Sequence, residues 1–112
     1  MTERYIVIRK GPRTLELHEG NRVLGHYPVA IGKPSTPTPE GIFAVAVKRV
    51  HPGGVFGSRW LGLSAPGYGI HGTNNPASIG QTVSMGCIRM HNRDVERVFD
   101  LVQVGTRVII YR

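Results

Sequence analysis

Residues 69–92 carry the sequence GIHGTNNPASIGQTVSMGCIRMHN, in which the reactive side chains of the chain are concentrated among glycines. The stretch holds the only cysteine, Cys87, which follows Gly86 and stands two residues before Arg89. A glycine lets the backbone approach a ligand closely, and a neighbouring arginine lowers the pKa of a thiol. The pattern therefore predicts a nucleophilic cysteine rather than a small inert side chain.

A thiol nucleophile needs a base, and histidine is the usual one. Of the five histidines, His71 is the best candidate, because the neighbouring Gly69 and Gly72 leave its side chain room at the rim of a cleft. His91 stands four residues after Cys87, which also fits a zinc-binding pair, but the chain has no second cysteine to complete such a site. The sequence predicts ordinary strand or loop positions for the remaining histidines, which are His18, His26 and His51.

The 15 glycines and 8 prolines of the chain divide it into short apolar pieces, which is typical of a sheet-rich fold. Residues 32–41 contain three prolines and are expected to be extended. Residues 51–58 are expected to form a glycine-rich loop. Alternating or β-branched runs predict strands at residues 4–9, 14–18, 23–31, 42–50, 60–63 and 106–111.

One helix is predicted, from Asn92 as the N-cap through Gln103. Asp94 and Glu96 lie in its first turn, where acidic side chains interact favourably with the helix dipole. Gly105 is expected to end it. Its apolar side chains recur at helical spacing, at Val95, Val98, Phe99 and Val102.

The chain has 112 residues, of which 40% are hydrophobic and 19% charged. This composition predicts a single domain with its own core over residues 1–112. No run approaches the roughly 18 apolar residues of a membrane span, and residues 1–10 lack the parts of a secretory signal. We expect no membrane span, and the sequence leaves open whether the protein stays inside the cell or derives from a longer, exported precursor.

The formal net charge is +7, and 11 arginines and 3 lysines supply the positive side chains. They are scattered from Arg4 to Arg112 rather than gathered in a run. Their field would attract nucleic acid and anionic cell-wall polymer alike. Because no helix, zinc or aromatic-interleaved binding motif accompanies the charge, we predict a solvated basic surface and no nucleic-acid partner.

Two motifs in the central stretch resemble the signature of the L,D-transpeptidase catalytic domain, also called the YkuD domain. They are IHGT at residues 70–73 and SMGCIRM at residues 84–90. TPTPEGIF at residues 36–43 is similar to the family's Thr-Pro-x-Gly-x-Phe segment, and VGTRV at residues 104–108 is similar to its C-terminal close. The resemblance implies a mostly β, sandwich-like fold with one short α-helix, and acyl transfer on peptidoglycan stem peptides.

The resemblance also implies roles for individual residues. Cys87 would be the nucleophile and His71 the base, with the backbone carbonyl of Gly72 orienting the imidazole in place of a carboxylate. The sequence fits this arrangement, because it has no Asp or Glu between Glu40 and Asp94. The remaining implied roles are an oxyanion hole from the amides of Gly86 and Cys87, and loop bracing or substrate contact by Ser84 and Arg89.

Three further positions concern substrate preference. Met85 departs from the family, which more often has a polar residue there; this affects the expected substrate preference and not the chemistry. Trp60, Tyr68 and the loop of residues 51–59 are expected to line the donor cleft, although Trp60 fits a core position equally well.

The implied reaction is a ping-pong transfer. Cys87 would form a thioester with the third residue of a tetrapeptide stem and release D-alanine, and an amine on a neighbouring stem would then give a 3→3 cross-link. Water in place of the amine would make the protein an L,D-carboxypeptidase. The competing hypotheses are a wall-binding module, which would be expected to lose the motif residues, and a cytosolic thiol enzyme of another kind. The resemblance implies no metal or organic cofactor, and we expect a monomer outside the cytoplasm.

Overall fold

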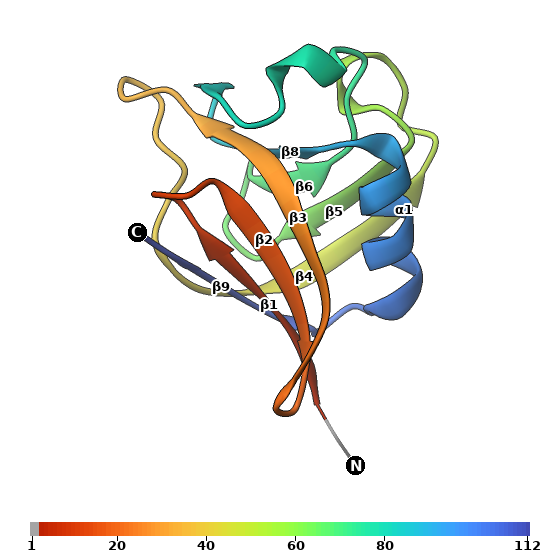
Figure 1. Cartoon of the computed structure of the whole chain (residues 1–112). Helices are drawn as coiled ribbons and strands as arrows, with labels where there is room; N and C mark the ends of the chain where they lie inside the picture. The colour runs from red at the N-terminus through yellow and green to blue at the C-terminus, as the bar shows by residue number, and fades with distance from the viewer. Residues whose placement is uncertain (1–2) are drawn as a thin grey trace.

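Strands make up about half of residues 3–112, the part of the chain that the computed structural model describes (Figure 1). The predicted mostly β architecture is confirmed. The single α-helix of this part is α1 (Asn92–Leu101). The strands are β1 (Arg4–Arg9), β2 (Thr14–Glu19), β3 (Arg22–Gly32), β4 (Gly41–Val50), β5 (Arg59–Leu63), β6 (Gly69–His71), β7 (Thr82–Ser84), β8 (Ile88–Met90) and β9 (Arg107–Tyr111).

The strands pair in the order β2-β1-β9-β4-β5-β6-β8-β3-β7, and β2 also pairs with β3. This extra pairing closes the first eight strands of that order into a ring, to which β7 is attached through β3. A closed ring leaves few edge strands open to association with other chains. The predicted sandwich is therefore continuous around its sides, as a barrel is.

The first two strands contribute apolar side chains to the core. Ile6 and Ile8 of β1 stand opposite Leu17 and Leu15 of β2, and all four are fully buried. Burying a side chain of this size contributes about 1.5–3 kcal/mol. The rest of the core includes Val29, Val45, Leu61, Ile70, Ile88, Met90, Val95, Val98, Val108 and Ile110.

The helix exists where the sequence predicts it, but both predicted ends are wrong. The N-cap position belongs to His91, whose side chain makes no capping bond, and Asn92 is already helical. At the other end Val102 adopts an extended conformation with φ −120° and ψ 166°. Lys48 Nζ donates there to the carbonyls of Phe99 and Val102, at 2.6 and 2.7 Å, so these carbonyls have a partner after the helix stops.

Three strands near the central motifs lie outside the strand ranges predicted from the sequence. These are β6, β7 and β8, and each has only three residues. A segment so short shows no alternation that could be distinguished from a loop. They nevertheless position the site, because β8 joins β6 to β3 in the ring, and the loops of residues 72–87 gather at the end of the molecule opposite the start of β1 (Figure 1).

Candidate active site

A cleft of about 310 Å³ brings most of the predicted site residues together. Residues of β5, β6 and β8 form part of its wall, and the turn Gly54–Phe56 and the loop of residues 84–87 complete it. We call residues 84–87 the Cys87 loop. The lining residues are Val55, Phe56, Trp60, Gly67, His71, Ser84, Met85, Cys87 and Arg89.

His71 is the last residue of β6, and its side chain is held on several sides. Its Nδ1 lies 2.5 Å from the carbonyl oxygen of Gly72. A carbonyl can only accept, so Nδ1 carries the proton and Nε2 is left as the acceptor. The ring stacks on Trp60 with centroids 5.7 Å apart, and Phe56 meets it edge-on at 5.1 Å.

This packing leaves His71 only 4% exposed. Burial lowers the pKa of His71, and the bond to Gly72, which favours the charged ring, does not cancel that effect. The positive charge of Arg89 lowers the pKa further. His71 is therefore a neutral imidazole at neutral pH, the protonation state that can accept a proton.

Cys87 is half-buried immediately before β8, and its Sγ lies 3.8 Å from the carbonyl oxygen of Gly67. Burial raises the pKa of the thiol, and the backbone bond with Gly69 and the charge of Arg89 oppose that rise without reversing it. The prediction of a lowered thiol pKa is therefore wrong for the resting site, because burial outweighs the nearby cation. The sequence does not predict the contact with the Gly69 backbone, since a backbone group leaves no motif.

The Cys87 loop is held by the hydroxyl of Ser84, which is only 2% exposed. Ser84 Oγ donates to the carbonyl of Cys87 at 2.6 Å and accepts the N–H of Gly86 at 3.1 Å. Gly86 has φ +119°, and a Cβ there would lie 2.6 Å from the ring of Tyr68. Ser84 thus braces the loop, and the Gly86 N–H, to which the family resemblance assigns an oxyanion-hole role, is bonded inside the loop.

Of the two aromatic residues predicted to line the cleft, only one does so. Trp60 lines it and stacks on His71. Tyr68 does not, because its ring packs against Gly86 and the hydrophobic core and so supports the loop from behind. Met85 stands at the cleft rim with 73% of its surface exposed.

A second segment, residues 33–40, supports the Cys87 loop. Thr38 is only 1% exposed; its Oγ1 accepts the N–H of Gly32 and donates to the carbonyl of Gly86, both at 2.9 Å. Thr36 Oγ1 donates to the carbonyl of Ser84 at 2.9 Å. Neither threonine is predicted as a site residue, although both lie in the TPTPEGIF segment that resembles the family.

Asn92 is the other contributor that the sequence does not predict. Its Oδ1 accepts the N–H groups of Ser58 and Thr73 at 3.1 Å, and its Nδ2 donates to the carbonyl of Thr73 at 3.0 Å. A Cβ on Gly72 would collide with this Oδ1. The Asn92 side chain, which the sequence predicts as a helix cap, therefore connects Thr73, just after His71, to Ser58. Ser58 follows the turn Gly54–Phe56, which lines the cleft.

The family model of the YkuD L,D-transpeptidase catalytic domain matches residues 3–110. The chain belongs to this family. Relatives named L,D-transpeptidase YkuD are 54% identical over 108 residues in Bacillus subtilis and 53% identical over 105 residues in Bacillus licheniformis. The alignments cover 96% and 94% of this chain but 66% and 64% of the relatives, so the chain spans about two thirds of their length.

Solved L,D-transpeptidase structures share the fold. The catalytic domain of the E. faecium L,D-transpeptidase has a TM-score of 0.84 at 24% identity, over 99% of this chain and 98% of that one. L,D-transpeptidase 3 from Mycobacterium tuberculosis, in complex with a faropenem-derived adduct, has a TM-score of 0.88 at 19% identity, over 99% and 61% of the two chains. The predicted L,D-transpeptidase-like fold is confirmed.

The other histidines of this L,D-transpeptidase domain lie outside the cleft. His18 and His26 both face Glu16, with Nε2 to oxygen distances of 2.9 and 3.7 Å, and His91 precedes α1. Among residues 3–112 the structure brings no three His, Cys, Asp or Glu side chains into a set that could hold a metal ion. That the protein needs no cofactor stays a prediction.

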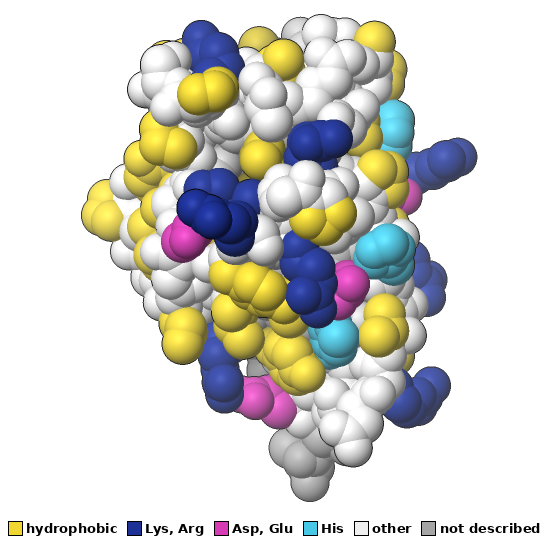
Figure 2. All heavy atoms as spheres, turned by 60° about the vertical axis from the view of Figure 1, so that its left-hand side comes forward, with side chains coloured by type: hydrophobic (Ala, Val, Ile, Leu, Met, Phe, Trp, Pro, Cys, Tyr) yellow, Lys and Arg dark blue, Asp and Glu magenta, His cyan; other side chains and the backbone are white. Residues whose placement is uncertain are grey.

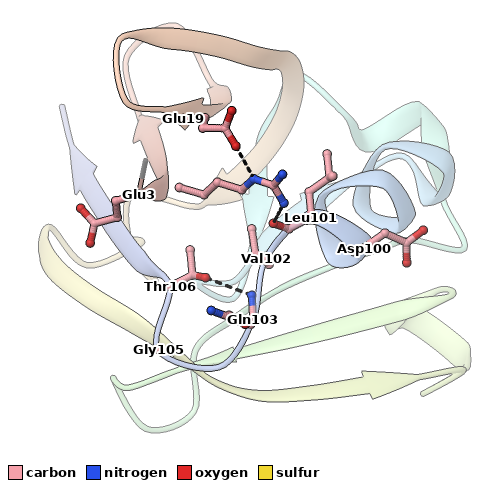
Figure 3. A pocket seen from close by; sticks show the side chains of 9 residues that line it. Glu3, Glu19, Asp100, Leu101, Val102, Gln103, Gly105 and Thr106 are labelled. Atoms are coloured by element: carbon pink, nitrogen blue, oxygen red, sulfur yellow. Dashed lines mark hydrogen bonds and ion pairs between the residues drawn. The ribbon is translucent and has the colours of Figure 1, made fainter. Parts of the chain in front are cut away.

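A larger cavity, of about 570 Å³, lies between the start of β1 and the segment after α1 (Figure 3). The side chain of Arg4 lines it, with Nε 2.9 Å from a carboxylate oxygen of Glu19 and a guanidinium nitrogen 2.9 Å from the carbonyl oxygen of Leu101. None of the predicted site residues lines this cavity. Size alone does not identify the active site of this L,D-transpeptidase domain.

Basic side chains are dispersed over the surface. On the face shown in Figure 2, lysine and arginine side chains stand separately among hydrophobic and polar atoms rather than in one continuous patch. Several are paired with acids, such as Arg4 with Glu19 and Arg107 with Glu3. No helix in the described part of the chain is long and apolar enough to cross a membrane.

Proposed function

We propose that this chain is a cysteine-dependent acyltransferase that acts on peptidoglycan stem peptides, with Cys87 as nucleophile and His71 as base. One observation carries the proposal. Cys87 and His71 line the same cleft, and the Nδ1 of His71 is committed to the Gly72 carbonyl. The other ring nitrogen is thereby available to take the thiol proton, which is the role a general base must fill.

The reaction starts from a neutral pair. As Sγ of Cys87 attacks the carbonyl that joins the third residue of a tetrapeptide stem to its terminal D-alanine, its proton passes to Nε2 of His71. The Gly72 carbonyl stabilises the imidazolium that forms. When the C–N bond breaks, His71 returns the proton to the leaving amine, D-alanine departs, and a thioester remains on Cys87.

Negative charge develops on the carbonyl oxygen during attack. We assign its stabilisation to the N–H of Cys87, because the N–H of Gly86 donates to Ser84. A Gly86 contribution would need that bond to break as substrate binds. An aligned backbone donor of this kind accelerates acyl transfer by about a hundredfold to a thousandfold.

The thioester is resolved by an amine or by water. An amine from a second stem gives a 3→3 cross-link, and water gives L,D-carboxypeptidase activity with the same residues in the same roles. We place the enzyme outside the cytoplasm, where this polymer lies, and its net charge of +7 would also attract anionic wall polymer. Cell fractionation tests the location, and recovery only from the cytosol would contradict it.

A carbapenem tests the assigned nucleophile. The faropenem-derived adduct of the M. tuberculosis protein motivates this choice. We expect the protein to gain the mass of one opened lactam on Cys87, found by peptide mapping, because a strained lactam mimics the scissile amide. Cys87→Ser should lose the adduct, since a serine hydroxyl has a far less acidic proton. No adduct after long incubation with several carbapenems would contradict the assignment.

A further inference from the structure

Arg89 is a cation in the cleft that no acidic residue neutralises. It takes part in none of the ion pairs formed within residues 3–112. The sequence has no Asp or Glu between Glu40 and Asp94, and Glu96 of α1 accepts a 2.6 Å bond from the hydroxyl of Ser58. An arginine without a carboxylate partner, placed beside a nucleophile, is available to bind an anion.

The strand register directs this side chain toward the reacting groups. Arg89 pairs with His71 on the neighbouring parallel strand. Ile88 and Met90, on either side of it in β8, are fully buried in the core. Because side chains alternate along a strand, Arg89 projects to the opposite face, where it lines the cleft together with Cys87 and His71.

The other walls of the cleft are mostly apolar. Val55, Phe56 and Met85 contribute exposed hydrophobic surface, with 57%, 40% and 73% of their areas accessible, and Trp60 lies beside them. The cleft therefore offers one permanent positive charge among hydrophobic surfaces. Such a site favours a donor that carries a carboxylate and disfavours one that brings only an ammonium group.

We propose that Arg89 binds a carboxylate of the donor peptide and so selects donors that carry one close to the scissile bond. The inference rests on the proposed function. Two groups of a stem peptide have this chemistry, namely the α-carboxylate of the leaving residue and a side-chain carboxylate on the third residue. The first lies one residue from the scissile carbonyl, about 3.8 Å along the backbone. Arg89 is two residues from Cys87, about 7 Å in an extended chain, which a guanidinium can span.

The test compares three donors. They are a tetrapeptide with free carboxylates, the same peptide with a C-terminal carboxamide, and one whose third residue lacks the side-chain carboxylate. The native protein should prefer the first donor in kcat/KM by about tenfold to a hundredfold over the donor that lacks the bound carboxylate. Which of the two modified donors is poor identifies the group that Arg89 binds.

Variants show whether the preference depends on Arg89. Arg89→Gln should remove the preference, because it should slow the donors that carry the bound carboxylate more than the donor that lacks it, and Arg89→Lys should keep part of the preference. Arg93→Gln is the charge-matched control, because the Arg93 side chain is 89% exposed outside the cleft. Equal slowing of all three donors in Arg89→Gln would mean that Arg89 acts only on the thiol and imidazole, and would overturn the inference.

A binding experiment distinguishes a failure of this inference from a failure of the proposed function. Calorimetry on Cys87→Ala should show tighter binding of the free acid than of the donor lacking the critical carboxylate, and the added Arg89→Gln substitution should remove the difference. If that difference holds while the native protein turns over no donor, the proposed function fails and the inference stands. If binding of all donors is equal before and after Arg89→Gln, the inference fails. Circular dichroism of each variant controls for folding.

Discussion

At the scale of single residues, the site combines a neutral thiol with a neutral imidazole. Burial raises the pKa of Cys87 and lowers the pKa of His71. Both shifts disfavour the charged forms, because a partly buried, partly apolar cleft solvates ions poorly. In the proposed reaction, Cys87 is therefore activated at the moment of attack, by proton transfer to His71, rather than stored as a thiolate.

Alkylation by iodoacetamide measures this state directly. Since the thiol pKa is raised, the midpoint of the rate against pH should lie above the ordinary value of about 8.5. Arg89→Gln should move the midpoint further up, because the Arg89 charge lowers the thiol pKa, whereas Arg93→Gln should not move it. A midpoint well below 8.5 would show a stored thiolate–imidazolium pair and contradict this account.

At the scale of elements, short segments far apart in sequence hold the Cys87 loop. Thr38 bonds both Gly32 and Gly86, and the position is almost fully buried. Thr38→Val keeps the shape of the side chain but leaves the N–H of Gly32 and the carbonyl of Gly86 without partners. The free energy of unfolding should therefore fall by about 1–3 kcal/mol. Activity should fall as well, because the loop loses a support.

The matched control for Thr38 is Thr82→Val, since Thr82 is exposed in β7. Chemical denaturation measures the loss of stability, and steady-state kinetics measure the loss of activity. If Thr38→Val and Thr82→Val are equally stable and equally active, Thr38 does not support the Cys87 loop.

Lys48 links β4 to the end of α1. Its Nζ donates to the carbonyls of Phe99 and Val102 and lies 4.2 Å from the centre of the Phe99 ring. Lys48→Met keeps the aliphatic stem and removes the charge, so the free energy of unfolding should fall by about 1–3 kcal/mol. Thermal unfolding of Lys48→Met, compared with that of Lys33→Met, measures this loss of stability; Lys33 is exposed and serves as the control. Equal melting temperatures for the two variants would contradict this role.

The sequence predicts elements where a pattern has room to repeat. The runs in β1 and β4 are long enough to show β-branched, apolar character, whereas three residues of β8 are not. At the site, the sequence points to Cys87 and His71 because their motifs are local. Thr38 and Asn92 are not, because each acts on residues 34 or 48 positions away, a separation that no local spacing encodes.

At the scale of the whole molecule, the closed ring of strands places the chemistry at one end. Pairing of β2 with β3 completes the ring, and β6 and β8 lie side by side within it. His71 and Arg89 thereby become neighbours although they belong to different strands, with Cys87 beside them in the cleft. The paired strands hold His71, the proposed base, next to Arg89, while Cys87, the proposed nucleophile, lies on a loop that hydrogen bonds brace.

The central claim is that Cys87 transfers an acyl group from a tetrapeptide stem. The most direct measurement is D-alanine release from a purified muropeptide tetrapeptide, with and without an amine acceptor. We predict release by the native protein, an acceptor product lacking that residue, and no release by Cys87→Ala. A pentapeptide ending in two D-alanines should be slower by about a hundredfold, because the carbonyl of its terminal peptide bond belongs to a D-residue rather than an L-residue, and a misplacement of the reacting carbonyl by about 1 Å costs that much in rate. Equal turnover of both donors, or release that survives Cys87→Ala, would contradict the claim.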